Sequence, residues 1–135
     1  MNIKRNLALI IACLLLFITA RVDGQVNNRD LIIGKWSFVR FDWPESVPSG
    51  AKIIAESTKN FTGVVYVFTK DNKFIMTKKG DSKNWNKTTT YSFSKDNNSV
   101  NLAAGQTMEI RFLSEDTMTI YVKGFDPMGI FRKIP

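Results

Sequence analysis

The sequence predicts an all-β fold in which eight antiparallel strands follow one another as a meander and close into a barrel, with a short helix in the first connection. After Asp30 the chain divides into short segments rich in Val, Ile, Thr, Phe and Tyr, separated by Asn, Asp, Gly and Ser. Connections after the second segment are short, so consecutive strands are expected to pair as hairpins.

Most of the predicted strands alternate apolar and polar side chains, which gives each strand one dry face and one wet face. Closure into a barrel would bury the dry faces and remove the two free edges that invite aggregation. The interior of an eight-stranded barrel is either filled by side chains or large enough for one small ligand. The predicted strands are residues 31–41, 63–69, 73–79, 85–94, 99–103, 107–113, 117–124 and 130–135.

Only the first connection, residues 42–60, is long, and its prolines exclude a strand. Residues 49–58 are expected to form about two turns of helix, with Ser49 as the N-cap. Ile53 and Ile54 would then face the body of the protein.

The first residues are predicted to be a signal peptide. A short basic start is followed by an apolar run from Leu7 to Ala20, too short for a membrane span of about 20 residues. Cleavage after Gly24 is preferred because small residues precede the bond, and cleavage after Ala20 is the alternative. We therefore expect an extracytoplasmic protein, periplasmic or secreted, with no stable membrane span after processing.

The predicted organisation is a signal peptide, residues 1–24, and one barrel domain, residues 25–135. Cys13 follows a stretch that resembles a bacterial lipobox, but the apolar run continues beyond it. This position argues against lipidation of Cys13.

Composition excludes several kinds of chemistry. Cys13 is the single cysteine and the chain has no histidine. Thiol nucleophiles, Ser-His-Asp triads, Cys/His zinc sites and histidine-ligated haem are therefore absent from the predicted domain. We expect no enzymatic activity, no metal and no cofactor.

The net charge of +7 comes from scattered lysines, which are typical of a solubilising surface. A nucleic-acid interface would need denser basic clusters, so no nucleic-acid partner is expected. An acidic ligand remains compatible with this charge.

The motif Gly34-Lys35-Trp36 at the start of the first strand, together with Arg132 in the last, resembles the lipocalin-like (calycin) group. The resemblance spans residues 30–135 and is greatest for the short, cysteine-free, exported bacterial members. It implies that Trp36 plugs the closed end of the barrel and that Arg132 packs across its ring. Gly34 would let the chain bend there, and a cation over an indole adds about 0.5–2 kcal/mol.

The dry face supplies candidate residues for binding a small hydrophobic or amphiphilic molecule, although each could equally be plain core. These candidates are Phe38, Phe74, Met76, Tyr91, Phe93, Phe112, Met118 and Ile120.

Arg40 is spaced by two residues from Phe38 and by four from Trp36, so in a regular strand its side chain would point inward as theirs do. A buried arginine needs a partner, and an anionic ligand would provide one. Alternatively, Arg40 lies at the rim and reaches water.

A second function class is a binding module with a filled barrel, such as an inhibitor, that contacts a protein partner through its outer surface. Phe41, Trp43 and Phe125 near the loops would be its anchors. Cavity volume separates the two classes, because a ligand cup needs at least about 300 Å³.

Overall fold

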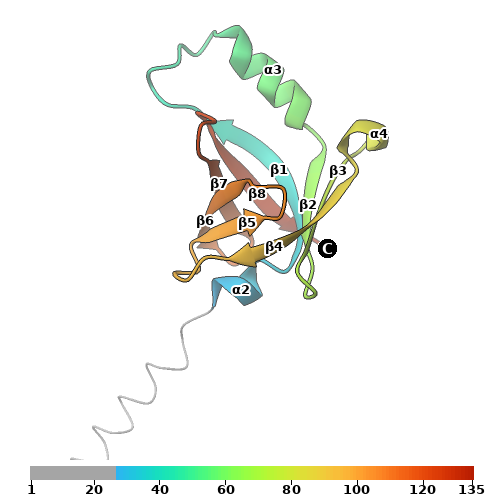
Figure 1. The fold of residues 1–135 in the computed structure, drawn as a ribbon. Helices are drawn as coiled ribbons and strands as arrows, with labels where there is room; N and C mark the ends of the chain where they lie inside the picture. The colour runs from blue at the N-terminus through green and yellow to red at the C-terminus, as the bar shows by residue number, and fades with distance from the viewer. Residues whose placement is uncertain (1–26) are drawn as a thin grey trace, which may run out of the picture.

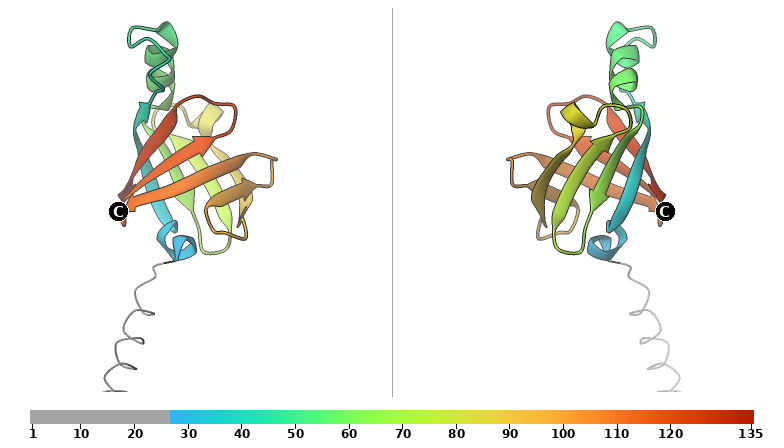
Figure 2. Two further views of the ribbon diagram at one scale, coloured as in Figure 1. Left: turned by 90° about the vertical axis from the view of Figure 1, so that its left-hand side faces the viewer. Right: turned by 90° about the vertical axis from the view of Figure 1, so that its right-hand side faces the viewer.

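The structure is a computed structural model that describes residues 27–135, and in this range eight strands form a closed antiparallel barrel (Figures 1 and 2). Each strand pairs with its neighbour in sequence, and the last pairs with the first, so the predicted closed meander is confirmed. The strands are β1 (Gly34–Asp42), β2 (Val64–Phe68), β3 (Lys73–Lys78), β4 (Lys87–Phe93), β5 (Ser99–Leu102), β6 (Thr107–Ser114), β7 (Thr117–Val122) and β8 (Met128–Ile134). The predicted signal peptide, its cleavage sites and Cys13 lie outside the described residues.

The first connection contains the predicted short helix, α3 (Lys52–Phe61). Its N-cap is Ala51, which makes no side-chain capping bond, so Ser49 is not the cap. None of its residues is buried, and Ile53 is 53% exposed, so the expectation that Ile53 faces the body is wrong. Figures 1 and 2 show why: α3 extends beyond one end of the barrel instead of lying on its side.

Two short helices were not predicted. The first, α2 (Asn28–Leu31), precedes β1 and lies at the end of the barrel opposite α3 (Figure 1). The other, α4 (Ser82–Trp85), joins β3 to β4, so Trp85 belongs to a helical turn rather than to the predicted strand.

Trp36 seals the end of the barrel that lies next to α2. Its side chain is fully buried, and the indole Nε1 donates a hydrogen bond of 2.8 Å to the carbonyl of Ile32, itself fully buried. Gly34 has a φ of +137°, and a Cβ there would lie 2.8 Å from Lys133 Cε. The glycine therefore provides both the backbone conformation and the space that this seal requires.

The cation over Trp36 is Lys133, whose Nζ lies 5.3 Å from the ring centroid. The expectation that Arg132 takes this place is wrong because β8 alternates. Lys133 pairs with Trp36 and shares its inner face, whereas Arg132 pairs with Ser37 and is exposed. Lys133 Nζ also donates to the carbonyl of Leu31, at 3.3 Å, which ties the residues before β1 to the last strand.

The three hairpin turns at the Trp36 end share one side-chain arrangement. In each turn a hydroxyl donates to the carboxylate two residues further on, and the pairs are Thr69–Asp71, Ser94–Asp96 and Ser114–Asp116. These hydrogen bonds lower the pKa of each aspartate. Charged turns thus join the strands at this end, while the two longest connections, residues 43–63 and 79–86, stand at the other end.

Replacing Trp36 by Ala should lower the free energy of unfolding by about 3–5 kcal/mol, because the largest buried side chain leaves a cavity behind. Chemical denaturation followed by circular dichroism measures this loss. Leu113→Ala is the control, since Leu113 is 58% exposed on β6 and should change the value by only about 0.5 kcal/mol. Equal losses in the two variants would show that Trp36 does not seal the barrel.

Acid should destabilise the protein through the three turn aspartates. Their folded-state pKa values are lowered, so the unfolded chain binds more protons below about pH 4, the ordinary aspartate range. The stability they contribute is complete above that range and is lost as the pH falls through the folded-state values. Urea midpoints measured between about pH 6 and pH 3 should fall less steeply in a variant with all three aspartates changed to Asn. A parallel fall in both proteins would contradict this assignment.

Candidate functional site

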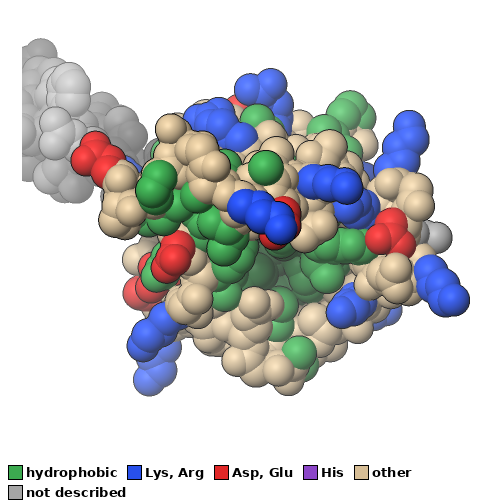
Figure 3. Space-filling model, turned by 90° about the horizontal axis from the view of Figure 1, so that it is seen from above, with side chains coloured by type: hydrophobic (Ala, Val, Ile, Leu, Met, Phe, Trp, Pro, Cys, Tyr) green, Lys and Arg blue, Asp and Glu red, His purple; other side chains and the backbone are tan. Residues whose placement is uncertain are grey.

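A cavity of about 790 Å³ opens at the end of the barrel opposite Trp36. Viewed from that end, the molecule is hollowed, and the hollow is lined mainly by hydrophobic side chains (Figure 3). The first, third and last connections at this end contribute Phe61, Gln106 and Phe125 to its lining.

Aromatic rings form one side of the cavity. Phe41 at the end of β1 contacts Phe61 of α3 edge-on, with centroids 4.8 Å apart, and Phe125 at 5.7 Å. Phe61 in turn packs edge-on against Trp85 of α4, at 5.3 Å. Edge-to-face contacts of this kind stabilise beyond the burial of area alone. The proposed surface anchors Phe41 and Phe125 therefore belong to the cavity wall, and Trp43 packs behind Phe41 at 6.1 Å.

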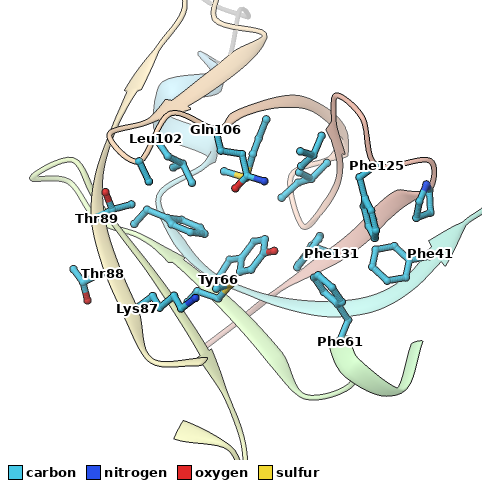
Figure 4. Close-up of a pocket in the computed structure, with 18 residues that line it drawn as sticks. Phe41, Phe61, Tyr66, Lys87, Thr88, Thr89, Leu102, Gln106, Phe125 and Phe131 are labelled. Atoms are coloured by element: carbon cyan, nitrogen blue, oxygen red, sulfur yellow. The ribbon is translucent and has the colours of Figure 1, made fainter. Parts of the chain in front are cut away.

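Polar side chains gather on the other side of the cavity. They are Lys87 and Thr89 of β4 and Gln106 of the connection between β5 and β6, and Figure 4 shows them across the cavity from Phe41, Phe61 and Phe125. Thr88 borders the cavity too, but it alternates with Lys87 and Thr89, and its side chain points outward. Strand pairing explains the position of Lys87. It pairs with Met76, which pairs with Tyr66, so the three side chains share the inner face of the barrel.

The strand β4 is only partly paired beside these polar residues. It pairs with β5 from Tyr91 onward, and Ala103 N–H donates to the carbonyl of Thr90. Residues 87–89 have no β5 partner in the described register, and Ala104 and Gln106 of the β5–β6 connection line the cavity beside them.

Tyr66 lies between the two sides, and its hydroxyl points into the cavity (Figure 4). The residue is 9% exposed, and no hydrogen bond among the described residues involves its hydroxyl. Burial raises the pKa of Tyr66 far above its ordinary value, so the phenol stays neutral and keeps its proton. It is a hydrogen-bond donor with no protein partner inside a largely apolar cavity.

Three of the predicted dry-face residues line this cavity: Phe74, Met76 and Ile120. The others pack elsewhere. Phe38, Tyr91 and Met118 are buried in the core. Phe93 and Phe112 are half-buried, and Phe112 packs against Trp36 with centroids 5.8 Å apart. The alternation along these strands correctly predicted that the side chains point inward. It does not tell how far along the barrel axis each side chain lies.

Arg40 does not point into the barrel. The pairing of β1 with β8 shifts register between Phe38 and Arg40, which marks a β-bulge. The extra residue turns Arg40 outward, where its side chain is 62% exposed and its Nε lies 3.1 Å from Asp42 Oδ1. The expectation of an inward arginine is wrong, and the alternative that Arg40 reaches water is the one observed.

The sequence contained a signal for one residue that was missed. Lys87 has the same parity as Tyr91 and Phe93, so the alternation already pointed it inward. Tyr66 had no such signal, since its strand is apolar on both faces. Gln106 lies in the turn between β5 and β6, and the conformation of that turn brings its side chain to the cavity. Alternation along strands does not predict side-chain directions in turns.

Comparisons with known proteins identify the fold alone. No protein-family model matches the chain, and no curated protein matches it. Among solved structures, a DUF4847 family protein from Bacteroides vulgatus ATCC 8482 is similar, with a TM-score of 0.50 and 14% identity. The similarity covers 76% of this chain and 93% of that chain. At this identity it supports the barrel architecture and assigns no activity.

The described part of the chain lacks two features, a membrane-spanning helix and a metal-binding cluster. Within residues 27–135, no helix has the length and apolar character needed to cross a membrane. The same residues contain no group of three or more side chains placed to hold a metal ion.

Proposed function

We propose that this protein is a lipocalin-like carrier that holds a small hydrophobic or amphiphilic molecule in its barrel and acts by binding rather than by catalysis. The observation that carries the proposal is the cavity of about 790 Å³. Sites for small molecules have volumes of about 300–1,000 Å³, with mostly apolar walls and a few polar groups. The cavity described above has this composition.

The sealed end supports the lipocalin-like part of the proposal. Gly34 and Trp36 of the Gly-x-Trp motif close one end of an eight-stranded meander, as the resemblance implies, although Lys133 supplies the cation. A barrel closed at one end and open at the other is suited to receive a ligand from a single direction.

Binding without catalysis is favoured by the titratable groups that face the cavity. Among its described lining residues, Lys87 is the only one with a charged side chain, and no carboxylate is present. General acid–base catalysis needs a side chain within reach of the reacting atoms with a pKa near the working pH. The raised pKa of Tyr66 takes its hydroxyl further from that range.

The alternative, a protein-binding module, required a filled barrel. The cavity argues against it, and two of its three proposed anchors line that cavity. A protein partner at another surface remains compatible with the structure, but no specific contact surface among the described residues favours one.

A neutral fluorescent probe, N-phenyl-1-naphthylamine, should bind in the cavity with a rise in emission, because the walls are apolar and exclude water. Met76→Trp should weaken this binding about tenfold or more, because Met76 lines the cavity and the larger side chain occupies the probe's space. Leu113→Trp adds the same indole on the exposed face of β6 and should leave binding unchanged. Circular dichroism checks that both variants fold. Failure of the wild-type protein to bind the probe would refute the proposed function.

We also propose that the protein works outside the cytoplasm, on the evidence of its basic start and apolar run before residue 21. Mass spectrometry of the protein purified from its own host should find a chain that begins at Gln25, or alternatively at Arg21. A chain that retains residues 1–20 would exclude export through this signal. A diacylglyceryl group on Cys13 would instead show a lipoprotein.

A further inference from the structure

We propose that the ligand is an anionic amphiphile and that Lys87 recognises its negatively charged head group. This inference rests on the proposed function and adds to it the chemical class of the ligand and the residue that selects it. The argument uses the position of Lys87, its lack of a protein partner and the distribution of polar groups around the cavity.

Lys87 is held at the cavity by the barrel itself. It pairs with Met76 on β3, and both side chains lie on the inner face. Figure 4 shows its side chain running along the wall toward the cavity. Lys87 is exposed, so water reaches its side chain while its aliphatic stem packs along the cavity wall.

No acidic side chain neutralises Lys87 within the described structure. It takes part in none of the ion pairs of the described residues, and no carboxylate lines the cavity. Several exposed lysines lack a protein partner too, but among the described lining residues Lys87 is the only lysine. A cation at an apolar wall with no counter-charge favours a ligand that brings one.

The cavity divides into two sides that match the two ends of an amphiphile. Lys87, Thr89 and Gln106 stand on one side, and Phe41, Phe61, Phe125 and Phe131 stand opposite (Figure 4). A charged group placed among the rings would lose its hydration without compensation. A charged group beside Lys87 keeps access to water and gains a charge-assisted hydrogen bond.

Tyr66 indicates that the ligand also has an oxygen near the centre of the cavity or at its head. Its hydroxyl points into the space between the two sides and has no hydrogen-bond partner among the described residues. Because the phenol stays neutral, it can donate a hydrogen bond to a ligand oxygen placed there. A purely hydrocarbon ligand would leave both Tyr66 and Lys87 unpaired.

Displacement of N-phenyl-1-naphthylamine by three single-chain compounds of equal length tests the inference. Decanoate, decanol and decyltrimethylammonium each have a ten-carbon chain, and their head groups are negative, neutral and positive respectively. The wild-type protein should bind decanoate most tightly and decyltrimethylammonium most weakly. Lys87→Met keeps the apolar stem and should weaken decanoate about tenfold, the loss of one charge-assisted contact, while decanol changes by less than about twofold.

Two further variants separate recognition from general effects. Lys87→Arg keeps the charge and should retain most of the preference for decanoate. Lys123→Met removes the same charge from the β7–β8 connection, at the same end of the barrel, where the side chain is exposed and does not line the cavity. It should bind all three compounds as the wild-type protein does.

The possible outcomes distinguish this inference from the function on which it rests. If the neutral probe binds but decanoate and decanol compete equally in the wild-type protein, the anionic class is refuted and the carrier function stands. Equal weakening of decanoate by Lys123→Met and Lys87→Met would overturn the assignment to Lys87 in favour of general surface charge. If the neutral probe does not bind at all, the proposed function itself fails.

Discussion

The seal that Trp36 makes at one end of the barrel is the interaction on which the rest of the structure depends. Its indole donates to the Ile32 carbonyl from a fully buried position and lies beneath the ammonium of Lys133. The residues before β1, the first strand and the last strand are thereby joined at one point. With that end filled, side chains near the other end can stand apart and leave a cavity without opening the core to water from both sides.

Two tyrosines inside the barrel mark where the solid core gives way to the cavity. The Tyr91 hydroxyl donates a 2.9 Å hydrogen bond to the carbonyl of Thr69, near the Trp36 end, and Tyr91 does not line the cavity. Tyr66 points its hydroxyl into the cavity and has no partner among the described residues. The hydroxyl of Tyr91 is thus used within the fold, whereas that of Tyr66 is left facing the cavity.

The two ends of the barrel also differ in their connections: those at one end close the barrel, and those at the other end line the cavity. Short hairpins with hydroxyl–carboxylate pairs close the Trp36 end, and they need little space or sequence. The connections at the other end are more varied, and they bring Phe61, Gln106 and Phe125 to the mouth. The similar solved structure is 14% identical to this chain, so the similarity concerns the architecture and not the residues of the lining.

The sequence by itself determined the strand content, the meander, the short helix in the first connection and the glycine and tryptophan of the seal. Local signals sufficed there, because alternation, turn residues and short connections act between residues close in the chain. Tertiary structure alone decided which inward side chains border empty space, because that depends on their depth along the barrel axis. It also decided where the two arginines lie. A bulge turned Arg40 outward, and the register of β8 against β1 put Lys133 over Trp36 in place of Arg132. Register and bulges arise from pairing between distant strands, and no stretch of sequence read alone contains them.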